Sequence, residues 1–242
     1  MIDKKLVKQR FSKHLSAYNQ NAKVQKQMAE KLLSYLDFER KYDSILEIGC
    51  GTGFLTKLAA EKLFYQDYNC IDIVPDCEDY IKKINSKIEF TPCDMEEFLN
   101  NTEKKYDLII SNASFQWIEN FESFGKLLIS KLNNGGVLLF STFGQENYRE
   151  IFFTIGKTLK YKNRNEIKEI FKEYKTSIEE EIRILSFNTP KDILKHLKST
   201  GVNGIESTRW TKKDLADFEN GYNNICSGNP TLTYNPIYVM VK

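Results

Sequence analysis

The fold is decided by residues 44–53, which read Ser44-Ile45-Leu46-Glu47-Ile48-Gly49-Cys50-Gly51-Thr52-Gly53. The short apolar run before the glycines predicts a buried strand, and Phe54-Leu55 and Leu58-Ala59 follow at helical spacing. The unit is therefore expected to be a strand, a glycine-rich turn and a helix. Glycine permits a tight turn and leaves no Cβ between chain and ligand, and the helix start offers free N–H groups. The sequence predicts a ligand-binding turn at this point.

The spacing of the glycines distinguishes between classes of cofactor. A nicotinamide or flavin fingerprint reads G-x-G-x-x-G, whereas here Phe54 occupies the position of its third glycine. The glycines run G-x-G-x-G, and Glu47 lies two residues before the first. This combination is similar to the first motif of the class I S-adenosylmethionine (SAM) methyltransferases. The glycines alone leave a generic turn of an α/β domain as the alternative.

The composition is typical of a globular enzyme with one sizeable core. The chain has 242 residues, of which 41% are hydrophobic and 28% charged, and its net charge is only +2. This charge predicts neither nucleic-acid nor membrane binding, and no apolar run reaches the length of a membrane span. The five cysteines form no C-x-x-C pair, and only His14 and His196 are histidines. We expect reduced thiols, no metal site, no secretory signal and a cytoplasmic location.

Apolar periodicity predicts alternating strands and helices along the first 144 residues. The predicted strands are at about 44–48, 68–73, 87–91, 108–112 and 137–142. The predicted helices are at 21–36, 54–63, 76–84 and 121–132, the last one ended by the turn residues 133–136. Residues 10–19 are predicted to be irregular. This alternation indicates an α/β fold with a doubly wound, mostly parallel sheet.

The pattern changes after residue 145 to charged helices with one predicted strand at 182–187. A final strand at 234–241 is expected to rejoin the sheet. We therefore predict one methyltransferase domain over 1–242. Its parts are an N-terminal helical cover (1–40), a SAM-binding core (41–144), a helix-rich substrate lid (145–230) and a last strand (231–242).

Ligands of open parallel sheets bind at the carboxyl ends of the strands, so the residues at these ends are candidates for binding the cofactor. Asp72 is placed to accept hydrogen bonds from two ribose hydroxyls, and Asp94 to accept one from the adenine amine, while Met95 can pack on the ring. Taken alone, Asp72 could instead cap the next helix and Asp94 could be a turn residue. The predicted cofactor-binding set is Glu47, Gly49, Cys50, Gly51, Gly53, Asp72, Ile73, Cys93, Asp94, Met95, Asn112 and Ala113.

Further motifs narrow the resemblance from the class I SAM methyltransferases to a single family. They are Arg10-Phe11-Ser12 with Ala17-Tyr18-Asn19, Ser111-Asn112-Ala113-Ser114-Phe115-Gln116-Trp117, Phe140-Ser141-Thr142-Phe143-Gly144, the segment 193–203, and Leu232-Thr233-Tyr234-Asn235-Pro236-Ile237-Tyr238. Together they resemble the malonyl-acyl-carrier-protein O-methyltransferases of biotin synthesis, although Asn235 stands where that family is expected to have His. The resemblance implies a seven-stranded sheet with a helical lid insertion. It also implies SAM as cofactor, S-adenosyl-L-homocysteine as product, and no metal.

The reaction that the resemblance implies is methylation of the free carboxylate of a malonyl thioester carried by acyl-carrier protein or coenzyme A. An ionised carboxylate needs no general base, so no acid or base residue is expected. Candidates to orient the substrate are Tyr18, Gln116, Trp117 and Arg149, and the alternative for Arg149 is an exposed salt bridge with Glu146 or Glu150.

The basic residues of 157–175 could face an acidic carrier or simply be solvated. Other functions left open are methylation of another small carboxylate or metabolite, and a non-catalytic SAM-fold protein that only binds a partner.

Overall fold

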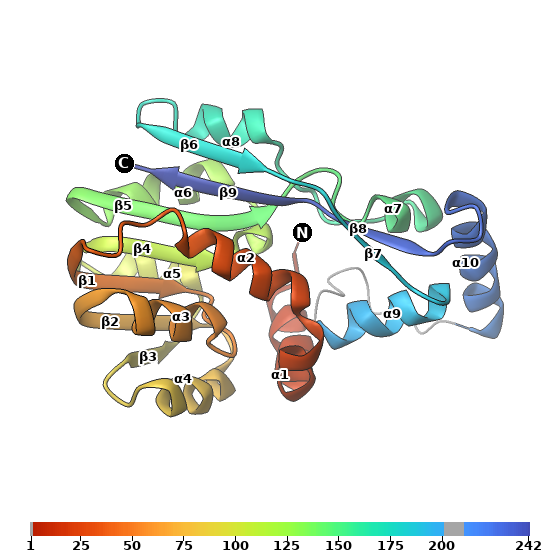
Figure 1. The fold of residues 1–242 in the computed structure, drawn as a ribbon, viewed down its shortest axis with the longest axis horizontal. Helices are drawn as coiled ribbons and strands as arrows, with labels where there is room; N and C mark the ends of the chain where they lie inside the picture. Colours follow the sequence, from red (N-terminus) through yellow and green to blue (C-terminus); the bar gives the residue numbers. More distant parts are fainter. Residues whose placement is uncertain (1, 201–210) are drawn as a thin grey trace.

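The computed structural model describes residues 2–200 and 211–242 of the chain (Figure 1). Residues 201–203, the end of the motif 193–203 that resembles the family, and residues 204–210 of the predicted lid lie outside the described residues.

A seven-stranded sheet forms the centre of the described fold, in the order β3-β2-β1-β4-β5-β9-β6 (Figure 1). Strands β1 to β5 pair in parallel, whereas β9 is antiparallel to both β5 and β6. The strands are β1 Lys41–Ile48, β2 Phe64–Asp72, β3 Glu89–Pro92, β4 Tyr106–Asn112, β5 Leu132–Phe143, β6 Thr176–Glu180 and β9 Pro236–Val241. The prediction of a doubly wound, mostly parallel seven-stranded sheet is confirmed.

Helices cover both faces of this sheet, because each face presents its own cluster of buried apolar side chains. One face is covered by α2 Lys23–Leu33, α3 Phe54–Lys62 and α4 Glu78–Ile84. The other is covered by α5 Met95–Asn101, α6 Phe121–Ser130 and α8 Arg164–Ile170.

The remaining elements lie beyond the carboxyl ends of the parallel strands, on the right of Figure 1. They are the helices α1 Lys4–Asn21, α7 Arg149–Ile155, α9 Pro190–Ser199 and α10 Lys212–Ile225, and the strand pair β7 Arg183–Ser186 and β8 Thr231–Tyr234. Two short 3-10 helices, η1 Pro75–Cys77 and η2 Phe115–Trp117, follow β2 and β4. These elements cover the edge of the sheet formed by the carboxyl ends of its parallel strands, which is where open parallel sheets bind ligands.

The prediction that residues 10–19 are irregular is wrong, because they belong to α1. The carboxylate of Asp3 caps this helix by accepting a hydrogen bond from the backbone N–H of Leu6 at 3.0 Å. The predicted helix 21–36 is correspondingly shorter, since α1 ends at Asn21 and α2 begins at Lys23. Helix α1 has few apolar residues, so its periodicity is weak in the sequence.

Residues 133–136 do not end a helix, as the sequence suggested. Helix α6 already ends at Ser130, and β5 begins at Leu132. Leu132 pairs with Tyr106 and Val137 pairs with Leu108, so the residues between them form a bulge opposite β4. The side-chain amide of Asn133 supports the bulge by donating to Asp107 at 2.8 Å.

The C-terminal part has more strands than the sequence predicted. Strand β6 joins the main sheet, and the predicted last strand is divided at Asn235 into β8 and β9, which belong to different sheets. Buried Asn235 holds this junction: its side-chain amide donates to Glu180 at 3.0 Å, and its carbonyl oxygen accepts from the Glu146 N–H at 3.0 Å. The division into cover, core and lid stays a prediction.

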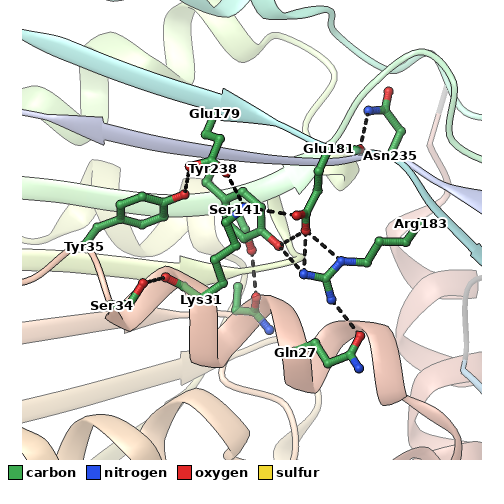
Figure 2. Close-up of polar contacts among 11 residues, drawn as sticks. Gln27, Lys31, Ser34, Tyr35, Ser141, Glu179, Glu181, Arg183, Asn235 and Tyr238 are labelled. Carbon is green, nitrogen blue, oxygen red and sulfur yellow. Dashed lines mark hydrogen bonds and ion pairs between the residues drawn. The ribbon is translucent and has the colours of Figure 1, made fainter.

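A polar network fastens α2 to the edge of the sheet (Figure 2). Lys31 of α2 binds the carboxylates of Glu179 and Glu181, the latter at 3.0 Å. The Tyr35 hydroxyl donates to Glu179 at 2.5 Å, and the Tyr238 hydroxyl of β9 donates to Glu181 at 2.6 Å. This network fixes the helix that covers the cavity described next.

Candidate functional site

A cavity of about 120 Å³ lies at the carboxyl ends of β1, β2 and β4, beneath α1 and α2. Every predicted cofactor-binding residue except Gly53 lines it, namely Glu47, Gly49, Cys50, Gly51, Asp72, Ile73, Cys93, Asp94, Met95, Asn112 and Ala113. The sheet topology therefore brings together residues as far apart in the sequence as Glu47 and Ala113.

The glycine turn is shaped by contacts that exclude larger side chains. Gly49 has φ +70°, and a Cβ on it would lie 2.2 Å from the Ser114 hydroxyl oxygen. Gly51 has φ +53°, and its N–H donates to the Asp72 carboxylate at 2.9 Å. A Cβ on Gly53 would instead meet the Ile84 side chain at 2.4 Å. Gly53 thus allows α3 to pack, and its predicted place in the cofactor site is not supported by the cavity lining.

Asp72 lies at the end of β2 with both carboxylate oxygens directed by backbone groups. One oxygen accepts from the Gly51 N–H and the other from the Val74 N–H, each at 2.9 Å. Burial raises the pKa of this carboxyl, and the two N–H donors partly oppose the rise. The Cys77 thiol and the Ile73 N–H also donate to this carboxylate, and the acceptor capacity that remains lies at the cavity, where a ligand hydroxyl can donate to it.

Glu47 is the acidic residue before the glycines, and it is almost fully buried at 1% exposure. The Tyr68 hydroxyl donates to its carboxylate at 2.5 Å. Burial raises the pKa of Glu47 to about 7, and the hydrogen bond from Tyr68 opposes this rise only in part. A cation placed in the cavity next to Glu47 would favour its ionised form.

Asp94 combines a structural contact with a place in the cavity wall. One carboxylate oxygen caps α5 by accepting from the N–H groups of Glu96 at 3.0 Å and Glu97 at 3.2 Å. The other oxygen lies 2.8 Å from the ammonium of Lys4 on α1. Asp94 therefore has the local structural role considered as the alternative, and it also lines the cavity.

Helices α1 and α2 cover the cavity with side chains that the sequence analysis did not assign to it, among them Lys4, Phe11 and Gln25. The rings of Phe11 and Tyr18 pack edge to face at 5.0 Å. Burial raises the pKa of the Tyr18 hydroxyl, so it is a neutral donor. The spacing of Phe11, Leu15 and Tyr18 at i, i+4 and i+7 was the signal that could have revealed this helix.

The polar end of β4 connects the cover to the sheet. Asn112 donates from its side-chain amide to the backbone carbonyl of Gln25 at 3.0 Å. Its carbonyl oxygen accepts from the Ser141 hydroxyl at 2.7 Å. Ala113 adopts φ +52°, unusual for a residue with a side chain, and so turns the backbone at the cavity wall. Asn112 thus links the end of β4 to α2 and to β5.

Three of the four substrate-orienting candidates line the cavity, and Arg149 does not. Tyr18 comes from α1, while Gln116 and Trp117 come from η2. Arg149 is 42% exposed, with its guanidinium 3.3 Å from Glu146 and 3.8 Å from Glu150. This is the salt bridge considered as the alternative, and it lies at the first residue of α7.

The cavity contains no arrangement for nucleophilic catalysis within the described part of the chain. Cys50 is buried, which raises the pKa of its thiol and keeps it neutral. Among the described residues, no group of three His, Cys, Asp or Glu side chains could hold a metal ion. No described helix has the length and apolar character needed to cross a membrane.

Comparison with known proteins gives a full-length match. The profile of a family described as "Methyltransferase domain" matches residues 20–205. A malonyl-[acyl-carrier protein] O-methyltransferase of Calditerrivibrio nitroreducens is 36% identical over 240 residues, covering 97% of this chain and 95% of that protein. A second such enzyme, from Ilyobacter polytropus, is 36% identical and covers 100% of this chain and 98% of its own length.

Solved structures share the fold at much lower identity. A putative methyltransferase from Bacillus halodurans has a TM-score of 0.62 at 12% identity, over 88% of this chain and 97% of that one. The N-methyltransferase NodS from Bradyrhizobium japonicum, solved with S-adenosyl-l-homocysteine, has a TM-score of 0.58 at 14% identity over 98% of both chains.

Proposed function

We propose that this chain, which belongs to the malonyl-[acyl-carrier protein] O-methyltransferase family, methylates the free carboxylate of a malonyl thioester with SAM. The product would be a methyl ester that enters biotin synthesis, together with S-adenosyl-L-homocysteine. The observation that carries the proposal is the full-length identity of 36%, which extends over the cover and lid as well as the core. The geometry of the cavity agrees with this chemistry.

The cavity residues fit SAM as an extended ligand. The carboxylate of Asp72 lines the cavity and can accept from the ribose hydroxyls, and Ile73, Cys93 and Met95 provide a surface for the adenine. Glu47 lies on the side of the glycine turn, where its carboxylate can balance the positive charge of the methionine part. When bound, SAM supplies an activated methyl group on a sulfonium.

The substrate carboxylate is ionised at neutral pH, so it needs no base. The residues of the chain contribute by orienting the substrate and by excluding water from the cavity. The anion and the sulfonium lose their charges together, so removal of water favours the transfer. Helix α1 closes the cavity, with Phe11 and Tyr18 above the glycine turn. Because Arg149 lies outside the lining, we assign the orientation of the carboxylate to the Tyr18 hydroxyl, the Gln116 amide and Trp117.

One assay tests the proposal. The purified protein is incubated with SAM and malonyl-carrier protein, and the product is expected to gain the mass of one methyl group in exchange for a proton. Free dicarboxylic acids serve as rival substrates, and their preferential methylation would favour the alternative small carboxylate. A calorimetric titration with SAM that shows no binding would contradict the cofactor assignment.

The carrier partner and the cytoplasmic location remain part of this proposal. Two basic residues of the segment 157–175 are engaged locally, since Lys162 pairs with Glu166 at 3.1 Å and Lys172 with Glu169 at 2.5 Å. These pairs are exposed and therefore weak, so an acidic partner could exchange them at little cost.

A further inference from the structure

A second cavity, of about 250 Å³, adjoins the first one at η2 and the end of β5. Among the described residues, the side chains that line both cavities are those of Gln116, Ile118 and Phe143. The outer wall comes from α8 and from residues 160–162 of the segment before it. The cofactor residues of the first cavity do not line the second, which leaves the second cavity without a role in SAM binding.

We infer that the second cavity receives the phosphopantetheine arm of the malonyl thioester and that Lys160 at its rim binds the phosphate of that arm. The inference rests on the proposed function. The arm is common to carrier protein and coenzyme A, so the same site serves either substrate.

The lining of the second cavity has the mixed character that this arm needs. Phe115, Ile118 and Ile167 provide apolar surface for the methyl and methylene groups. Thr142 and Gln145 provide hydroxyl and amide groups that can bond the two amides of the arm. An arm with alternating amides and hydrocarbon matches this distribution better than a small free acid does.

The charge at the rim can hold a phosphate. Lys160 is exposed and forms no ion pair with any described residue, whereas Lys162 is paired with Glu166. Glu119 and Glu166 also line this cavity, so its overall charge is balanced and Lys160 provides the available cation. An ammonium on a flexible stem is a common ligand for phosphate groups.

The junction between the two cavities carries an unsatisfied acceptor. The Gln116 side-chain N–H donates to the Ala113 carbonyl at 2.7 Å, while its Oε1 atom is buried without a hydrogen-bond partner. A buried acceptor of this kind is costly until a donor reaches it. An amide N–H near the thioester end of the arm can supply that donor, which would place the malonyl carboxylate beyond Gln116 in the first cavity.

The test compares substrates with and without the phosphate. Wild type, Lys160→Ala and Lys160→Glu are assayed with malonyl-coenzyme A, malonyl-carrier protein and phosphate-free malonyl-pantetheine, and SAM affinity is measured by calorimetry. We expect kcat/KM for the two phosphate-bearing substrates to fall about fivefold in Lys160→Ala and further in Lys160→Glu. Activity on malonyl-pantetheine and SAM affinity should stay at the wild-type values. Lys168→Ala, an exposed lysine of α8 outside both cavity linings, is the matched control.

A second variant tests the path of the arm itself. Gln145 is exposed at the mouth of the second cavity, so Gln145→Trp should obstruct it and lower kcat/KM at least tenfold for all three thioesters, with unchanged SAM affinity. Gln145→Ala removes the amide without filling the cavity, so it should lower kcat/KM only about two- to threefold, as expected for the loss of one hydrogen bond.

The inference would be overturned if the Lys160 variants lost kcat/KM equally for substrates with and without the phosphate. It would also be overturned if the kinetics were unchanged in both the Lys160 and the Gln145 variants. A wild-type protein that binds SAM but methylates no malonyl thioester would overturn the proposed function, and the inference with it.

Discussion

Glu47→Gln should remove a pH dependence of SAM affinity that is built into the cavity. The wild-type carboxyl has a pKa of about 7, because it is buried at 1% exposure. It is therefore about one-tenth ionised at pH 6 and about nine-tenths ionised at pH 8. If the cationic methionine part of SAM requires the carboxylate, affinity should be about tenfold higher at pH 8, equivalent to about 1.4 kcal/mol.

The assay is a calorimetric titration of SAM into wild type and Glu47→Gln at pH 6, 7 and 8. The amine of SAM titrates identically in both experiments, so the ratio of the two dissociation constants isolates Glu47. A glutamine oxygen can still accept the Tyr68 hydroxyl, so the fold should be kept. A ratio that stays constant from pH 6 to pH 8 would refute the reasoning.

The same group predicts a stability effect of known sign. The folded protein binds this proton more tightly than the unfolded chain, whose carboxyl has a pKa near 4.5. The unfolding free energy of the ligand-free protein should therefore fall as pH rises from about 4.5 to about 7, by about 3 kcal/mol for this group. Urea unfolding of wild type and Glu47→Gln at both ends of this range measures the difference.

Four other substitutions probe the cavity and its cover. Asp72→Asn, which loses one carboxylate acceptor, should weaken SAM binding at least about tenfold by calorimetry, and unchanged affinity would remove Asp72 from the site. Tyr18→Phe removes only the hydroxyl and should lower kcat/KM for the malonyl substrate about two- to tenfold at constant SAM affinity; wild-type kinetics would exclude this hydroxyl as a donor to the substrate. Arg149→Ala should leave steady-state kinetics near wild type because its guanidinium is paired outside the cavity, and a tenfold loss would restore it as a substrate ligand. Burial opposes ionisation of Glu181, yet hydrogen bonds from Tyr238 and Lys31 leave its pKa lowered, so its stabilisation should be lost as pH falls through that lowered pKa. Thermal melts between pH 7 and pH 3 should then show a smaller decline in Glu181→Gln, and identical declines would contradict the role of the network in Figure 2.

The sequence by itself was enough to predict the core of the fold and the residues proposed to bind the cofactor. Strand, glycine turn and helix follow each other within residues 41–62, so local periodicity and spacing were enough to place Glu47, Gly49 and Gly51. Asp72 and Asp94 followed from one rule, that parallel strands end at the same edge of a sheet.

The helices that cover the cavity and the residues on its substrate side could be identified only from the tertiary structure, because they depend on contacts between distant segments. Helix α1 is weakly amphipathic alone, and it is held by Lys4 on Asp94 and by Phe11 above Gly51. Arg149 was predicted as a substrate ligand because it follows β5, but in the folded chain its guanidinium pairs with Glu146 and lies outside the cavity lining. The split at Asn235 was invisible for the same reason: a continuous run of strand-forming residues does not reveal that its two halves pair with different partners.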